Sequence, residues 1–275
     1  MNINISYETF FMPLVLTILA GLSTVLGGML TFFVKKGNLK ALSVGLAFSA
    51  GVMIFLSLSE ILSESREFLI PTFHTKAQLI TMLSFLLGCL TAFLIDYFIP
   101  EHYEDEFLSA SENEEENRIY KQKIETKKIK RAGLLAALAI FIHNVPEGIA
   151  TFFVSSQTIK MGIPIAIAIA IHNIPEGIAV ALPIYQATGK KRIAIWYSFL
   201  SGMAEPLGAV LAFIVLQQFI TNDFIGVLFG MVAGIMVYIS LDTLLPLARK
   251  YGEDHLVLIG IISGMFFVAF GMLLI

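Results

Sequence analysis

Cysteine and charged residues are scarce in this 275-residue chain. Cys89 is the only cysteine, which excludes an intrachain disulfide and a metal site built from several thiolates. Charged residues make up 14% of the chain and hydrophobic residues 57%, with a mean hydropathy of +0.82. A composition this apolar argues against water as the solvent and favours an integral membrane protein.

Long apolar segments recur along the chain. About 20 helical residues cross a hydrocarbon core of about 30 Å, and each segment is long enough to do so. The segments are too long and too uniformly apolar for the alternating strands of a membrane barrel. We therefore predict an all-α, polytopic membrane protein with eight transmembrane helices, the first a retained membrane helix rather than a cleaved leader. The segments are 9–34, 39–62, 78–100, 132–155, 160–186, 193–216, 222–247 and 255–275.

The Lys and Arg residues gather in alternate connections between these segments. Fifteen of the 18 follow the first, third, fifth and seventh segments, and only Arg66, Lys76 and Lys160 fall on the other side. Because basic loops remain in the cytoplasm, this distribution predicts that both termini lie outside it.

Only one connection is long. Residues 101–131 begin acidic and end basic, and we expect a solvated cytoplasmic loop whose basic end lies near anionic lipid. A regulatory metal sensor is the alternative, for which His102 is the only good soft ligand. The loop separates helices one to three, in 1–100, from helices four to eight, in 132–275, which carry the candidate metal site.

A histidine, an asparagine and a glutamate occur together twice within apolar surroundings, in IHNVPEGIA from position 142 and IHNIPEGIA from position 171. In each copy the histidine and glutamate are four residues apart and the asparagine and glutamate three, so all three side chains share one helical face. Each histidine lies about 11 or 12 residues into its helix, near the bilayer midplane. The candidate ligands are His143, Asn144, Glu147, His172, Asn173 and Glu176.

The two helices that carry this motif are joined by only a few residues and must run antiparallel. The copies then face each other in opposite directions, and such an inverted repeat with a midplane site is typical of transporters. Pro146 and Pro175 each free a backbone carbonyl, which is tolerated at this depth only beside protein or water. The motif therefore indicates a polar cavity.

Glu205, in SGMAEPLG, is a third carboxylate at the same depth. One charge at the membrane centre costs about 2.5–3.5 kcal/mol, so three unpaired carboxylates cost on the order of 8–10 kcal/mol. No Lys or Arg lies at this depth in these helices to neutralise them. We expect divalent cations to compensate the charge.

Imidazole, amide oxygen and carboxylate are ligands suited to Zn²⁺, Fe²⁺, Mn²⁺, Co²⁺ or Cd²⁺ and poorly suited to Cu⁺. Because each motif glutamate can bridge two adjacent ions, a binuclear site is predicted, with no organic cofactor. One ion is expected at His143, Glu147, His172 and Glu176, and the other at Asn144, Glu147, Asn173, Glu176 and Glu205.

Four further residues are candidates for the transport pathway. Glu60 and Met53 are seven residues apart on one helical face, with Glu60 near the outer mouth. Glu60 is a candidate capture residue, whereas Met53 is either a thioether ligand or packing. Asp96 and Asp242 lie near the cytoplasmic ends of helices three and seven, either as exit ligands or as interfacial carboxylates.

The motifs SAGVM, HNVPEGIA, HNIPEGIA and GMAEPLGA, in this order, resemble the ZIP (Zrt/Irt-like) family of metal transporters, most closely its bacterial ZupT-like branch of zinc transporters. The resemblance covers essentially the whole chain. It implies a binuclear metal centre in helices four and five and metal uptake across the plasma (inner) membrane. It also implies a homodimer with an elevator-like moving bundle.

Three classes of function compete. The first is a carrier that moves divalent transition metal ions, zinc foremost, into the cytoplasm by alternating access, with metal ions and the lipid bilayer as partners and no nucleic acid. The second is an intramembrane metal-dependent enzyme, but the chain has neither H-E-x-x-H nor paired E-x-x-H motifs. The third is an ion channel, which transport kinetics distinguish from a carrier.

Overall fold

A computed structural model describes residues 7–98, 114–216 and 219–273, and this part of the chain is helical without any strand, which confirms the all-α prediction. Turns of π-helix at Ser57–Ile61 and Ser240–Leu244 join α2 to α3 and α9 to α10, and another follows α8 at Ala212–Leu216. The α-helices are α1 (Tyr7–Met29), α2 (Leu39–Leu56), α3 (Leu62–Phe73), α4 (Ala77–Phe98), α5 (Glu114–Gln157), α6 (Ile159–Thr188), α7 (Lys191–Gly202), α8 (Ala204–Leu211), α9 (Asn222–Ile239), α10 (Leu245–Tyr251) and α11 (Asp254–Met272).

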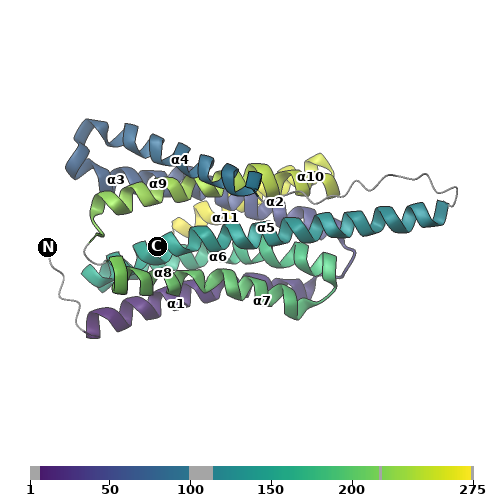
Figure 1. Ribbon diagram of the computed structural model, residues 1–275, viewed down its shortest axis with the longest axis horizontal. Helices are drawn as coiled ribbons and strands as arrows, with labels where there is room; N and C mark the ends of the chain where they lie inside the picture. The colour runs from purple at the N-terminus through teal and green to yellow at the C-terminus, as the bar shows by residue number, and fades with distance from the viewer. Residues whose placement is uncertain (1–6, 99–113, 217–218, 274–275) are drawn as a thin grey trace.

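Seven helical stretches of the described chain are long and apolar enough to cross a membrane, as expected of a multi-pass membrane protein. The longest, Leu39–Phe98, has 60 residues and contains the predicted segment 39–62 and most of the predicted segment 78–100. Within it the chain reverses at the 3-10 turn His74–Lys76, and α4 packs back against α3 (Figure 1). Eight crossings stay a prediction.

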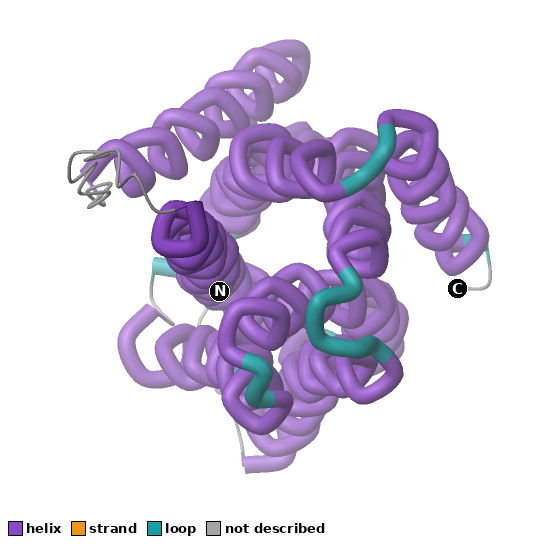
Figure 2. Tube along the Cα trace, turned by 90° about the vertical axis from the view of Figure 1, so that its right-hand side faces the viewer, coloured by secondary structure: helices purple, strands orange, loops and turns teal. Residues whose placement is uncertain are grey.

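The helices form two groups that lie side by side. We call α1, α5, α6, α7 and α8 the motif bundle, and α2, α3, α4, α9, α10 and α11 the companion bundle, because packing within each group is more extensive than packing between them. Figure 1 shows the companion bundle above the motif bundle, and Figure 2 looks along the helices from the end at which α5 projects. The bundles meet where α2 packs against α6 and α5 against α9.

Glycines bring α5 and α8 into close contact within the motif bundle. Gly148 of α5 lies against the backbone carbonyl of Glu205 in α8, and Gly208 of α8 lies against the backbone carbonyl of Val145 in α5. A Cβ atom at either glycine would collide with this backbone. The small residues therefore place Glu205 beside the first copy of the repeated motif.

Helix α5 is much longer than a membrane span, with 44 residues, and projects past the other helices (Figure 1). The second half of the predicted loop, from Glu114 to residue 131, is part of this helix rather than an irregular linker. This stretch contains no Gly or Pro and is rich in Glu, Lys, Gln and Arg, which are strong helix formers. The first half of the loop, with His102, lies outside the described residues.

Candidate metal centre

The two copies of the repeated motif lie on the packed helices α5 and α6 in the interior of the protein. Both helices continue through the motif prolines, Pro146 and Pro175. None of the seven candidate ligands has more than 4% of its surface exposed, and they are His143, Asn144, Glu147, His172, Asn173, Glu176 and Glu205.

The histidine of each motif copy pairs with the glutamate of the other copy. Nε2 of His143 lies 3.0 Å from Oε1 of Glu176, and Nε2 of His172 lies 3.2 Å from Oε2 of Glu147. The two contacts are reciprocal between α5 and α6. The histidine and the glutamate of one copy, four residues apart, therefore both contact the opposite helix.

The two asparagines are held by their amide nitrogens. Asn144 Nδ2 donates to the backbone carbonyl of Ser201 in α7 at 3.2 Å. Asn173 Nδ2 donates to the backbone carbonyl of Ala20 in α1 at 3.0 Å and to the carboxylate of Glu205 in α8. Three helices of the motif bundle, α1, α7 and α8, thus fix the orientation of the two amides.

Several buried oxygen atoms of these residues have no hydrogen-bond partner within the protein. Each of the three carboxylates keeps one such oxygen, and so does each asparagine side chain. The amide oxygens can only accept hydrogen bonds, and the carboxylate oxygens also only accept when the glutamates are ionised. Buried acceptors in proteins are normally satisfied. The atoms are Glu147 Oε1, Glu176 Oε2, Glu205 Oε2, Asn144 Oδ1 and Asn173 Oδ1.

Among the described residues, no set of three or more His, Cys, Asp and Glu side chains is arranged to hold one metal ion together. Each motif histidine points its Nε2 at a glutamate oxygen, so ring and carboxylate face each other instead of a common point. Metal binding at the predicted centre therefore requires the two His–Glu pairs to separate.

A cavity of about 140 Å³ reaches the candidate ligands Glu147 and His172. Glu60, the predicted capture residue, lines it, and so does Glu64, which the sequence analysis missed. The signal for Glu64 was available, because it lies four residues after Glu60 and therefore on the same helical face. Met53 is fully buried in the hydrophobic core and does not line this cavity.

Asp96 and Asp242 line a second cavity, of about 380 Å³, near the end of the protein from which α5 projects. The aspartates come from α4 and from the turn between α9 and α10, and the structure brings them to one place. Basic residues share this lining, so the cavity has mixed charge: Lys128, Arg131 and Lys250.

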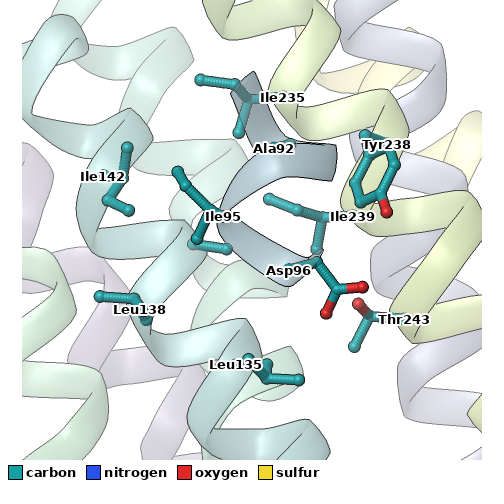
Figure 3. A pocket seen from close by; sticks show the side chains of 11 residues that line it. Ala92, Ile95, Asp96, Leu135, Leu138, Ile142, Ile235, Tyr238, Ile239 and Thr243 are labelled. Carbon is teal, nitrogen blue, oxygen red and sulfur yellow. The ribbon is translucent and has the colours of Figure 1, made fainter. Parts of the chain in front are cut away.

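A small cavity of about 30 Å³ adjoins the second cavity, and Figure 3 shows the side chains that line it. It shares Asp96, Leu135 and Thr243 with the second cavity and is otherwise lined almost entirely by apolar side chains. Its lining includes Ile142, the residue before His143, but none of the seven candidate ligands. Apolar side chains thus separate the candidate ligands from the second cavity.

The ZIP zinc-transporter family matches residues 99–272, which is more than half of the chain. The chain belongs to the ZIP family. It is 48% identical over 272 residues to a zinc transporter ZupT of Clostridium perfringens, covering 96% of this chain and 95% of that protein. It is 47% identical over 268 residues to a zinc transporter ZupT of Streptococcus mutans, covering 97% and 98% of the two chains.

Membership in the ZIP family confirms the resemblance inferred from the motifs. It also confirms the prediction of a transporter rather than an enzyme. In this ZIP chain, the structure buries all seven predicted ligands and places Glu60 on a cavity that reaches Glu147 and His172. Asp96 and Asp242 lie together but apart from these ligands.

Proposed function

We propose that this ZIP family member is a carrier that moves Zn²⁺ into the cytoplasm by alternating access. Its relatives are named zinc transporters, which supports zinc as the transported ion. Fe²⁺, Mn²⁺, Co²⁺ and Cd²⁺ accept the same imidazole, carboxylate and amide ligands, and we include them in the proposed substrate class.

The observation that carries this proposal is the set of unpartnered oxygens on three buried carboxylates. Ionised glutamates at membrane depth are costly, and no Lys or Arg lies in the apolar parts of these helices. A divalent cation supplies both the missing charge and the missing partners. The reciprocal pairs offer two glutamates that can bridge, which supports a binuclear centre with all seven predicted residues as ligands.

The first cavity supports a path for capture of the ion. Glu60 and Glu64 provide carboxylates along it, and Glu147 and His172 lie at the metal centre. With the basic connections in the cytoplasm, as the charge distribution predicts, this cavity faces the outside and both termini lie there. We therefore propose eight crossings and an outward-accessible arrangement in which the apolar side chains around Ile142 close the cytoplasmic route.

Release into the cytoplasm is proposed to pass through the second cavity. Asp96 and Asp242 offer oxygen ligands there, while the lysines and arginine nearby discourage a cation from staying. For the ion to reach it, the motif bundle must shift against the companion bundle so that the apolar barrier opens. The elevator-like motion, the homodimer and the inner-membrane location implied by the family resemblance belong to the same proposal.

Zinc uptake into proteoliposomes tests this function. The parent protein is expected to accumulate zinc with saturable, strongly temperature-dependent kinetics, as a carrier does and a channel does not. Glu147→Ala and Glu176→Ala should lower uptake by at least about 100-fold, since even outer-shell changes at metal sites cost 10–100-fold. Glu253→Gln, which changes a carboxylate with 83% of its side chain exposed, is the matched control and should transport normally. Equal uptake by all four proteins would contradict the proposal.

A further inference from the structure

Glu125 joins the two bundles at the end from which α5 projects. Lys250 Nζ donates to Glu125 Oε1 at 2.9 Å and lies 2.8 Å from Oε2, and the hydroxyl of Tyr251 donates to Oε2 at 2.7 Å. Glu125 belongs to α5 of the motif bundle, whereas Lys250 and Tyr251 end α10 of the companion bundle. We call these three residues the Glu125 clasp.

The clasp is anchored firmly on the companion side. The hydroxyl of Ser43 in α2 donates to the backbone carbonyl of Ala248 in α10 at 2.7 Å, and α10 packs along α2. On the motif side, Glu125 lies on the same continuous helix as His143 and Glu147. A shift of α5 against α10 therefore moves the metal centre and stretches the clasp together.

Geometry makes the clasp specific for one arrangement of the bundles. The clasp hydrogen bonds are 2.7 and 2.9 Å long, and a hydrogen bond is lost once its donor and acceptor are about 3.6 Å apart. Domain and bundle motions displace groups by considerably more than this. Lys250 also lines the second cavity, so the clasp lies beside the proposed exit.

We propose that the Glu125 clasp holds the bundles in the arrangement in which the metal centre opens to the first cavity, and that it must release before metal reaches the second cavity. This inference rests on the proposed alternating access and gives the helical second half of the long connection a role in controlling it. The Glu125 and Lys250 side chains are about 40% exposed, so the contact is screened by salt. An ion pair of this exposure shifts an equilibrium by about two- to fivefold.

Cysteine labelling in proteoliposomes measures that equilibrium. In a Cys89→Ser background, which retains a donor to the Gly234 carbonyl, Ala168→Cys reports on the first cavity and Thr243→Cys on the second. We expect Glu125→Gln to raise the ratio of the Thr243→Cys to the Ala168→Cys labelling rate by about two- to fivefold in low salt. In high salt, the parent ratio should approach that of the variant.

Two further variants separate the clasp from a general charge effect. Glu253→Gln breaks the 3.9 Å ion pair with Lys40 inside the companion bundle and should leave the ratio unchanged. Exchanging the charges, with Glu125→Lys and Lys250→Glu together, should restore the parent ratio. An unchanged ratio in Glu125→Gln, an equal change in Glu253→Gln, or no recovery in the exchanged pair would each overturn the clasp.

The same vesicles distinguish failure of the clasp from failure of the transport function. The Cys89→Ser parent is assayed for zinc uptake alongside the labelling. Zinc uptake by this parent, together with an unchanged labelling ratio in Glu125→Gln, would contradict the clasp but not the carrier function. Absence of zinc uptake in that parent counts against the carrier itself.

Discussion

Nε2 of His143 lies 3.0 Å from Oε1 of Glu176 on the facing helix, and both side chains are buried. This nitrogen is also the atom through which a neutral imidazole commonly binds a metal ion. A metal ion bound here would replace the hydrogen bond between His143 and Glu176 and would be coordinated by both side chains. In the proposed centre, metal binding would therefore require a local rearrangement of α5 against α6.

Glu205→Gln should remove a ligand for one ion while preserving the fold around it. The glutamine oxygen can still accept from Asn173, so the amide contact is retained. We expect bound zinc to fall from two ions per chain to one, and the zinc-induced rise in Tm to shrink, because stabilisation by a ligand follows its occupancy. Metal analysis and thermal unfolding in detergent measure these effects, and an undiminished zinc content would count against Glu205 as a ligand.

Glu64→Gln should weaken capture of zinc more than the maximal rate. Glu64 lines the first cavity, where negative charge raises the local cation concentration, so KM is expected to rise by up to about tenfold with little change in Vmax. Glu67→Gln is the control, since Glu67 is exposed on the same helix and is not part of the cavity lining. The same KM for both variants would argue against a capture role.

Gly148→Ala should disturb the metal centre through packing. The added methyl group would collide with the backbone of Glu205, and forced overpacking destabilises proteins by about 1–3 kcal/mol. We expect a lower Tm and slower zinc uptake. At Gly271, by contrast, the nearest atom to an added Cβ is 3.4 Å away on the Ile171 side chain, so Gly271→Ala should behave as the parent does. Parent-like behaviour of Gly148→Ala would contradict the described contact.

Acidic pH should slow zinc uptake at low zinc concentration. A histidine binds metal only in its neutral form, and its ordinary pKa of about 6.5 means that protons compete increasingly as the pH falls. The initial rate is therefore expected to drop between pH 7.5 and pH 5.5, measured with equal pH on both sides of the membrane. A high zinc concentration should make the uptake rate less dependent on pH. An uptake rate that does not change with pH at low zinc would show that protonation of the ligands does not limit transport.

The burial of the candidate ligands on two packed helices could be predicted from the sequence, because periodicity and depth are local properties. Spacings of three and four residues place His143 and Glu147 on one helical face, and a short connection forces α5 and α6 together. The partners of these side chains are not local. The sequence suggested that histidine and glutamate of both copies converge on an ion, whereas each histidine lies against the glutamate of the opposite helix.

Other features of the protein could be recognised only once the fold was known. Asp96 and Asp242 share a cavity only because α4 and α9 pack together, which neither residue's surroundings in the sequence indicate. The contact between Glu125 and Lys250 depends likewise on α5 lying beside α10. Two features were overlooked although the sequence carried them: the place of Glu64 one turn after Glu60, and the helix-forming composition of 114–131.

Equilibrium dialysis of the purified, chelator-stripped protein against zinc tests most directly whether the buried carboxylates are compensated by metal. The parent should bind two zinc ions per chain. The double variant Glu147→Gln and Glu176→Gln, which removes both bridging charges at nearly constant size, should bind fewer than one. A parent protein that takes up no zinc, or a double variant that binds as much as the parent, would contradict the account.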